Sequence, residues 1–359
     1  MLKWIEIDSS IIASNVRIIK NSLKKGVKLM AVVKAGGYGH GALITARTAV
    51  KNGASFLGVL TVDEALELRK GGIKTDIMTL SPCLKEELKK AAENSVIPTI
   101  DDIRLLKEAE NKKIKLSFNL DCDTGLKRWG IDPSMLNDFL KRAKDSEYAR
   151  LFSFSTHIAY TPYRNMTDAR EKLSLFGKLS EEVKKFFPKA LVHAANSLIL
   201  CDFPEFQFDM VRAGNLIYGI YPSDIYAKKK GGTPLKGIKR PWRFFAKIIS
   251  IKKVKAGEVF GYAGEITAYR DMVLASIPVG YSDGLTMEPR DNVYKISEGA
   301  SYWAEIKGRR APFVSKASIC NTILDITDIP GVKTGDIVSL AIRRTAANAN
   351  MARIERGRS

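Results

Sequence analysis

The sequence lacks a long apolar run, and cysteine and histidine are scarce in it. No stretch of about 18 consecutive apolar residues occurs, so we expect no membrane-spanning helix. The four cysteines, Cys83, Cys122, Cys201 and Cys320, are widely spaced and form no C-x-x-C pair, which argues against a disulfide framework or a zinc knuckle. The N-terminus carries acids where a signal peptide would be apolar. We therefore expect a soluble, cytoplasmic protein.

Acidic residues are also few relative to basic ones. Lys and Arg number 58 against 39 Asp and Glu, a formal net charge of +19, which raises the question of nucleic-acid binding. The densest basic stretches, 228–230, 236–243 and 343–358, lack the aromatic interleaving of a single-strand platform, and no nucleic-acid motif is recognised. We therefore expect solvated basic surfaces and no nucleic-acid partner.

The first 215 residues alternate short apolar, β-branched runs with longer charged segments of helical period, a pattern typical of parallel βα units. One helix start, Thr61-Val62-Asp63-Glu64, has capping-box spacing. Eight runs are strand candidates, the strand number of a barrel: 29–33, 55–60, 76–80, 96–100, 116–120, 151–156, 191–195 and 210–212. A doubly wound open sheet would give the same alternation, so periodicity leaves both folds open.

The pattern changes beyond residue 221. Residues 222–241 are rich in Lys, Gly and Pro and indicate a linker. The segments 244–254, 272–279, 304–314 and 319–326 then show a period of two, which predicts a small β domain. We predict a barrel over 1–225, a β domain over 226–340, and a basic tail over 341–359 that has no strand pattern and is frayed or disordered.

One lysine, Lys34, stands at the end of an apolar run and before a glycine-rich turn, in VVKAGGYGHG (32–41). Burial lowers the pKa of a lysine from about 10.4, so that the amine becomes a nucleophile or a base. A surface lysine before a loop is the alternative for such a residue taken alone.

Other polar residues follow the later predicted strands. The chain has only three histidines, His40, His157 and His193, and each lies at or just after a predicted strand end. Active sites of barrels lie at the C-terminal ends of the strands, and late strands there often form a phosphate site. The residues expected to meet Lys34 are Asp121, Arg128, His157, His193, Asn196, Ser197, Arg212, Gly214 and Asn215, and Tyr38 would add a phenol.

The Lys34 segment closely resembles the pyridoxal 5'-phosphate (PLP) lysine segment of alanine racemases. Further segments match that family's pattern: 4–8, 123–125 with Arg128 and Gly130, 156–157, 195–197, 211–214, 280–284 and 325–328. The resemblance implies an α/β fold, a (β/α)8 TIM barrel followed by a smaller, mostly-β domain. It also implies racemisation of alanine for bacterial cell-wall synthesis. The implied assembly is a head-to-tail homodimer in which the β domain of one subunit closes the barrel mouth of the other.

The resemblance also implies roles for individual residues. Racemisation needs a base on each face of Cα, and the family pattern assigns Lys34 to one face and Tyr262 of the partner subunit to the other. Arg212 cannot give up its proton, so it would keep the PLP ring nitrogen unprotonated and favour simple proton exchange. The implied cofactor-binding residues are Lys34, Tyr38, His157, Asn196, Ser197, Arg212, Gly214 and Asn215. Arg128 and Ile319 would bind substrate, with Asp121, His193 and Tyr281 supporting them and no metal.

The sequence departs from the family pattern at four places. Gly36 stands where Asn or Asp is usual, and Cys320 replaces an acidic or amide residue. Asp121 occupies the position of a lysine that many relatives carry carbamylated. We expect it to supply that carboxylate directly and to hold Arg128 by charge-assisted hydrogen bonds. The tail 341–359 does not resemble the family's final strands and lacks the tyrosine that contacts the phosphate.

Three other functions compete with alanine racemisation. A racemase acting on serine or lysine is a near variant of it. A barrel decarboxylase is disfavoured because no Gly-Gly-Gly phosphate loop and no Cys-Glu-Ser-type motif occur. A non-catalytic PLP carrier would consist of the barrel alone, and the predicted β domain with Tyr262 argues against it.

Overall fold

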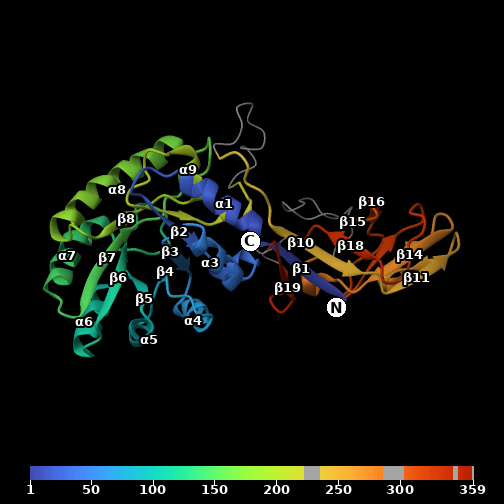
Figure 1. Cartoon of the computed structure of the whole chain (residues 1–359), viewed down its shortest axis with the longest axis horizontal. Coiled ribbons are helices and arrows are strands. Elements are labelled where there is room, and N and C mark those ends of the chain that lie inside the picture. Colours follow the sequence, from blue (N-terminus) through green and yellow to red (C-terminus); the bar gives the residue numbers. More distant parts are fainter. Residues whose placement is uncertain (222–234, 286–302, 343–346, 358–359) are drawn as a thin grey trace. The chain divides into compact units, whose positions relative to one another are not determined.

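The computed structural model describes residues 1–221, 235–285, 303–342 and 347–357 (Figure 1). The chain forms two compact units. The barrel unit comprises Ser10–Gly37 and Ala42–Arg240, and the β unit comprises Met1–Ser9, Tyr38–Gly41 and Pro241–Ser359.

Eight parallel strands form the centre of the barrel unit, in the order β8-β7-β6-β5-β4-β3-β2-β9. They are β2 (Lys28–Val32), β3 (Phe56–Val59), β4 (Asp76–Pro82), β5 (Val96–Ile100), β6 (Leu116–Asp121), β7 (Ala149–Ser155), β8 (Leu191–His193) and β9 (Met210–Ala213). The first and last strands of this order meet, because the N–H of Asp209 donates to Val192 O at 3.0 Å and the N–H of Arg212 donates to Ala195 O at 2.8 Å. The predicted barrel is confirmed, and the doubly wound alternative is excluded.

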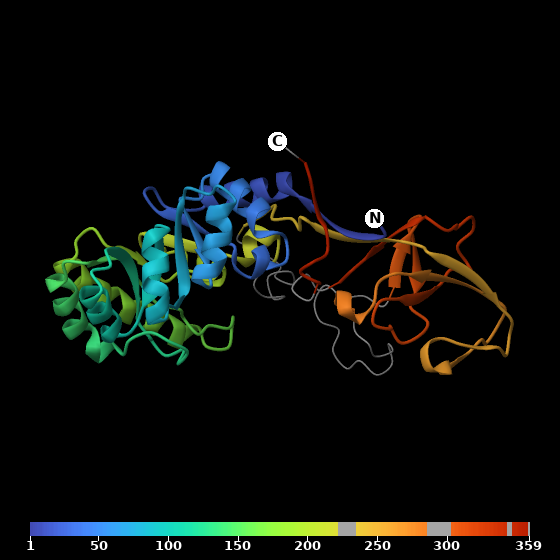
Figure 2. The same cartoon turned by 90° about the horizontal axis from the view of Figure 1, so that it is seen from below.

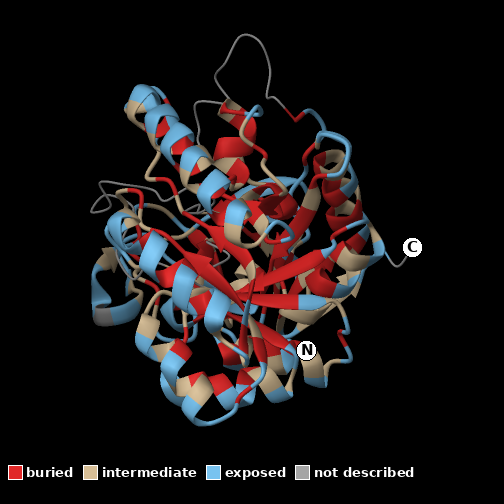
Figure 3. Cartoon of the chain, turned by 90° about the vertical axis from the view of Figure 1, so that its left-hand side faces the viewer, coloured by how far each residue is buried: buried red, intermediate tan, exposed pale blue. Residues whose placement is uncertain are grey.

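Helices surround this sheet: α1 (Ser9–Asn21), α3 (Ala42–Lys51), α4 (Val62–Lys70), α5 (Leu88–Glu93), α6 (Ile103–Asn111), α7 (Leu136–Asp145), α8 (Met166–Phe186), α9 (Ser197–Asp202) and the short 3-10 turns η1 (Lys85–Glu87), η2 (Pro133–Met135) and η3 (Asn215–Tyr218). The buried residues of α8, Ala169, Leu173, Phe176, Ser180 and Val183, recur every three or four positions, which gives the helix one inward face. Figure 3 shows buried residues on the central strands and exposed ones on the outer helices. No helix in the described part of the chain is both long and apolar enough to cross a membrane.

Antiparallel strands dominate the β unit. They are β1 (Lys3–Asp8), β10 (Trp242–Lys247), β11 (Ser250–Val254), β12 (Val259–Phe260), β13 (Ile266–Thr267), β14 (Met272–Ile277), β15 (Trp303–Ile306), β16 (Arg309–Pro312), β17 (Thr322–Asp325), β18 (Ile337–Leu340) and β19 (Arg353–Arg356), with the 3-10 turns η4 (Tyr262–Gly264) and η5 (Tyr281–Asp283). Six of the strands form one sheet in the order β16-β15-β18-β10-β1-β19, a second sheet is β11-β14-β17, and β12 pairs with β13. Buried Ala268, Met272 and Leu274 pack together in this unit. The mostly-β second domain is confirmed.

The unit boundaries differ from the predicted ones at the N-terminus. Residues 1–9 do not belong to the barrel, because β1 lies between β10 and β19. Figure 2 shows this blue strand among the orange and red strands of the C-terminal half. The barrel unit also extends to residue 240 instead of 225. The predicted linker lies, up to residue 234, outside the described residues.

The prediction that the tail has no strand is wrong for residues 353–356. β19 pairs in parallel with β1, with Ile5 opposite Arg353 and Asp8 opposite Arg356. It is an edge strand without a fully buried residue, so it needs no apolar alternation and leaves no signal in the sequence.

Candidate active site

Lys34 follows β2, at the C-terminal end of the barrel strands. The segment α2 (Lys34–Tyr38) is not a right-handed helix, because Ala35, Gly36 and Gly37 have φ angles of 52°, 61° and 66°. A left-handed conformation costs an L-residue about 1–2 kcal/mol, and glycine avoids that cost. The glycine-rich turn therefore carries backbone strain at Ala35, next to the lysine. Such strain is often found at functional sites.

A carboxylate that the sequence analysis did not assign to the site fixes this turn. Glu64 Oε1 accepts the N–H of Ala35 at 2.6 Å, and Glu64 Oε2 accepts the N–H of Leu60 at 2.6 Å. One half of the predicted capping box is formed, in which the N–H of Glu64 donates to Thr61 Oγ1 at 3.3 Å. The Glu64 carboxylate bonds to Ala35 and Leu60 in place of the backbone N–H of Thr61. Glu64 thus joins the end of β2 to the end of β3. The capping-box spacing identified the residue but could not reveal its bond to Ala35.

The environment of Lys34 favours a neutral amine. Burial lowers the pKa of Lys34, and the positive charges of Arg128 and Arg212 lower it further, while Glu64 opposes them. Burial lowers the pKa of His157 to about 3, with the positive charges of Arg212, Arg128 and Lys34 adding to the effect. Both shifts favour the neutral form of the side chain, which for Lys34 is the form that can act as a nucleophile or base. The structure therefore brings four of the side chains within electrostatic reach of one another: Lys34, Arg128, His157 and Arg212.

Four hydrogen bonds hold the buried guanidinium of Arg212 in place. It donates to His193 Nδ1 at 2.6 Å and to three carbonyl oxygens, of His193 at 2.8 Å, of Thr156 at 2.7 Å and of Ala194 at 3.1 Å. Burial lowers the pKa of Arg212 to about 10, and burial together with Arg212 lowers the pKa of His193 well below its usual value. Since a guanidinium can only donate, His193 is neutral and accepts at Nδ1. This pair holds a fixed positive charge at the strand ends.

Asp121 is the buried last residue of β6, where it accepts a hydrogen bond from Ser155 Oγ. Burial raises the pKa of Asp121 to about 7, against the opposing charges of Arg212 and Arg128. Asp121 and Arg128 line one small recess with Trp129 and His157, and the Arg128 guanidinium lies 3.7 Å over the Trp129 ring. The expected hydrogen bond between Asp121 and Arg128 is not formed among the described residues, because Ser155 bonds to the carboxyl and Trp129 supports the arginine. Charge alone couples the two.

The two segments proposed for phosphate binding meet. Ser197 Oγ accepts the N–H of Gly214 at 3.1 Å, and Asn215 begins η3 directly after it. Asn196 Oδ1 caps α9 by accepting the N–H of Leu198 at 2.9 Å and of Ile199 at 3.0 Å. The side-chain oxygen of Asn196 is therefore occupied by the helix cap, whereas the side-chain NH2 group takes no part in the cap.

The remaining predicted site residues belong to the β unit. Tyr262 begins η4 and is 65% exposed, and Tyr281 and Ile319 are 40% and 55% exposed. Tyr38 lies in the short segment 38–41, which also belongs to this unit.

The donor set of the barrel unit fits a phosphorylated aldehyde such as PLP. A lysine of lowered pKa can bond an aldehyde, and a buried guanidinium suits a ring nitrogen that accepts a hydrogen bond. No group of His, Cys, Asp or Glu within the described ranges could hold a metal ion. The fold and these residues define a class of barrel proteins with a partly buried lysine at the C-terminal ends of the strands.

Comparison with known proteins gives the family. Residues 7–222 match the family model "Alanine racemase, N-terminal domain", and residues 242–356 match "Alanine racemase, C-terminal domain". The chain belongs to the alanine racemase family, and the resemblance found in the sequence is confirmed. The second match runs to residue 356, so the tail does resemble the family's final segment, contrary to our expectation.

Known alanine racemases are similar in sequence over most of the chain. Alanine racemase 1 of Caldanaerobacter subterraneus subsp. tengcongensis is 32% identical over 340 residues, covering 93% of this chain and 84% of that protein. The alanine racemase of Desulfosudis oleivorans is 33% identical, covering 93% and 86%. The structure of alanine racemase from Bacillus anthracis with bound L-Ala-P is similar at a TM-score of 0.87 and 26% identity, covering 99% and 96%. The fold is also that of the Bartonella henselae enzyme with covalently bound pyridoxal phosphate, at a TM-score of 0.80 and 24% identity, covering 99% of this chain and all of that one.

Proposed function

We propose that this protein interconverts L-alanine and D-alanine with PLP as cofactor. The observation that carries the proposal is the position of Lys34, whose amine has a lowered pKa at the C-terminal end of a barrel strand. Family membership over nearly the whole chain supports the choice of reaction. When bound, PLP would withdraw electrons from the Cα–H bond of the amino acid and make its proton acidic.

The chain's own residues would divide the remaining work. Lys34 would hold PLP and then exchange a proton on one face of Cα, because burial and two nearby arginines favour its neutral amine. Arg128 would bind the substrate carboxylate. Arg212, held by His193 and three carbonyl groups, would place an unchanging positive charge against the ring nitrogen.

The opposite face of Cα needs a second base. We assign it to Tyr262 of a partner subunit, in a head-to-tail homodimer. Two features support this: Tyr262 belongs to the β unit, and its side chain is 65% exposed in the single chain. Tyr281 and the backbone N–H of Ile319 would contact the substrate from the same unit.

One experiment tests the function. Purified protein with PLP is incubated with L-alanine, L-serine and L-lysine in turn, and each product is resolved by chiral chromatography. We expect D-alanine to form fastest. Faster conversion of serine or lysine would move the assignment to that substrate, release of CO2 would indicate a decarboxylase, and PLP binding without turnover would indicate a carrier.

A variant of the central lysine makes the test specific. Lys34→Ala should lose both the borohydride-reducible link to PLP and the racemisation, since it removes the amine that performs both tasks. Lys28→Ala, at the start of the same strand, serves as the control and should keep both. A reducible link that persists in Lys34→Ala would overturn the assignment.

A further inference from the structure

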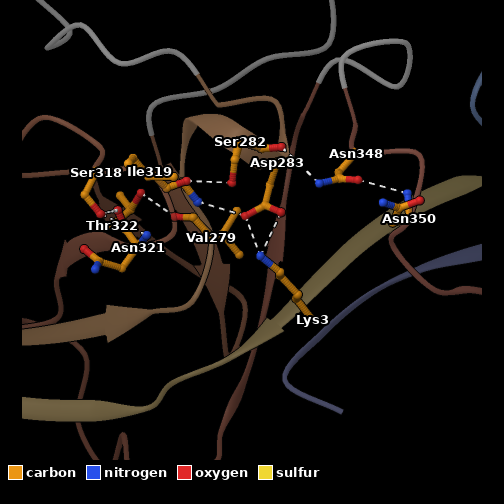
Figure 4. A network of polar contacts seen from close by, with 11 residues as sticks. Lys3, Val279, Ser282, Asp283, Ser318, Ile319, Asn321, Thr322, Asn348 and Asn350 are labelled. Carbon is orange, nitrogen blue, oxygen red and sulfur yellow. Dashed lines mark hydrogen bonds and ion pairs between the residues drawn. The ribbon is translucent and has the colours of Figure 1, made fainter.

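Two turns of the β unit lie against each other, and Figure 4 shows the polar contacts around them. One is residues 280–284, which includes η5, and the other is residues 318–321; together we call them the paired turns. The N–H of Tyr281 donates to Ser318 O at 3.0 Å, and the N–H of Ser282 donates to Ile319 O at 3.1 Å. The Ser282 hydroxyl donates to the same carbonyl of Ile319 at 2.7 Å.

The contact between the turns is close enough to require glycine. A Cβ atom added to Gly280 would lie 2.2 Å from Ser318 O and 2.4 Å from Ile319 O, which are backbone atoms that cannot move aside. Backbone therefore packs directly on backbone, and a shift of residues 280–284 would displace residues 318–321 with it.

Several side chains of the paired turns are exposed, so packing within the β unit does not fix their positions. Tyr281, Ile319 and Cys320 are all exposed. Their positions depend on the backbone of the turns, and hence on whatever fixes that backbone to the sheets.

An ion pair between a partly buried lysine and a buried aspartate supplies one such fixed point. Asp283 is buried, and Lys3 Nζ contacts its two carboxylate oxygens at 2.7 and 2.6 Å. The N–H of Gly280 donates to Asp283 Oδ2 at 3.1 Å, so the carboxylate also closes its own turn. Lys3 begins β1, where it is paired with Ala246 of β10.

We propose that Lys3 is a positioning residue for substrate binding, holding the paired turns, and with them Tyr281 and Ile319, through its ion pair with Asp283. The proposal rests on the proposed function in one respect, that Tyr281 and the backbone N–H of Ile319 contact the amino acid. We call the attachment of the paired turns to Lys3 through Asp283 the clamp, and it rests only on the contacts described above.

The clamp has a clear consequence for a lysine variant. In Lys3→Met the Asp283 carboxylate keeps one backbone donor and no cation, and a buried charge without a partner is strongly unfavourable. The carboxylate is then favoured to rotate toward water, which loosens the hydrogen bond to Gly280 that closes the turn. Arginine can replace the lysine, since it also donates to both carboxylate oxygens.

The kinetic test compares four variants with the wild-type holoenzyme. We expect Lys3→Met to raise KM for alanine about tenfold, a factor equal to about 1.4 kcal/mol. The kcat should change far less, since a loss of uniform binding raises KM alone. Lys3→Arg should restore KM, and Lys3→Met combined with Asp283→Asn should restore it in part by removing the buried charge. Lys255→Met, which breaks an exposed ion pair with Asp271 in the same unit, is the matched control and should leave KM unchanged.

The second readout does not depend on activity. Cys320 is exposed whereas Cys83, Cys122 and Cys201 are buried, so a fluorinated thiol reagent labels the second of the paired turns selectively. The fluorine NMR spectrum of labelled wild type, Lys3→Arg and Lys255→Met should show one narrow resonance. Lys3→Met should show a broadened or second resonance, while its circular dichroism and PLP content stay at wild-type levels.

The outcomes separate the two proposals. An unchanged fluorine spectrum in Lys3→Met would overturn the clamp, whatever the kinetics show. A changed spectrum with KM unchanged would overturn the role of Lys3 in substrate binding. If the wild-type protein does not racemise alanine, the proposed function fails, and the fluorine spectra still decide whether Lys3 holds the turns.

Discussion

At the scale of single residues, Tyr262 gives the sharpest test of the mechanism. Tyr262→Phe removes only the phenolic hydroxyl, so PLP binding and its absorbance spectrum should be unchanged. Racemisation should fall by about 10²–10⁴-fold, the usual contribution of a general base. The measurement is the wash-in of solvent deuterium at Cα from each enantiomer separately, because a single remaining base acts on one face.

A second tyrosine provides the control for this variant. Tyr269 lies in the same unit and is 75% exposed, and Tyr269→Phe should racemise alanine at the wild-type rate. If Tyr262→Phe exchanged deuterium into both enantiomers as fast as the wild type, another residue would be the second base.

Asp121 is the residue whose charge should respond to pH within the working range. Burial raises its pKa to about 7, so the ionised form, which adds a negative charge near Arg128, is gained as the pH rises through about 7. We expect KM for alanine to fall over that range in the wild type and to stay high in Asp121→Asn. Since no CO2 adduct is involved, added bicarbonate should change nothing. A bicarbonate requirement in the wild type, or Asp121→Asn kinetics equal to wild type, would show that Asp121 does not replace the carbamate.

The same carboxyl should affect stability with a defined sign. Its pKa in the folded protein lies above its ordinary value of 3.8, so the folded state binds the proton more tightly than the unfolded state. Folding stability from this group is therefore complete below about pH 4 and is lost as the pH rises toward 7, by on the order of 4 kcal/mol. Denaturant unfolding at several pH values should show this loss in the wild type and in Asp145→Asn, an exposed acid on α7, but not in Asp121→Asn.

At the scale of elements, the barrel strands could be predicted and the turn after Lys34 could not. Runs such as Val96–Ile100 are buried along their whole length, so burial on both faces leaves a continuous apolar signal in the sequence. The left-handed conformation of Ala35 leaves no such signal, because it depends on the distant carboxylate of Glu64. The roles of the residues at the strand ends stay predictions, as do the cytoplasmic location and the absence of a nucleic-acid partner.

Glu64→Gln tests this link between elements. An amide has one acceptor oxygen, so it can satisfy the N–H of Ala35 or of Leu60 but not both, and its NH2 group faces the other donor. We expect the free energy of unfolding to fall by about 1–3 kcal/mol and racemisation to slow, because Lys34 loses its fixed backbone. Glu67→Gln, an exposed position one turn along α4, should change neither quantity. Normal kinetics in a destabilised Glu64→Gln would limit Glu64 to a structural role.

At the scale of the whole molecule, strands from the two ends of the chain lie side by side in one sheet. β1 was assigned to the barrel because it precedes it, yet its neighbours are β10 and β19. The pairing of β1 with β19 joins residues near the two ends of the chain, such as Ile5 with Arg353. Periodicity reports only which face of a strand is buried and does not report its partner.

The proposed dimer predicts that two inactive variants restore activity when they are mixed. If each site takes Lys34 from one subunit and Tyr262 from the other, mixing Lys34→Ala with Tyr262→Phe produces heterodimers in which one site carries both changes and the other carries neither. Random exchange makes half of all dimers mixed, so activity should recover to about a quarter of the wild-type value in a C2 dimer. The measurement is racemisation after the two inactive variants are unfolded together and refolded with PLP. Mixing Lys34→Ala with the Lys34→Ala and Tyr262→Phe double variant is the control and should stay inactive, since no lysine is present. Absence of recovery in the first mixture, with mixed dimers detected by mass spectrometry, would show that both bases come from one chain, because every site would then retain one of the two changes.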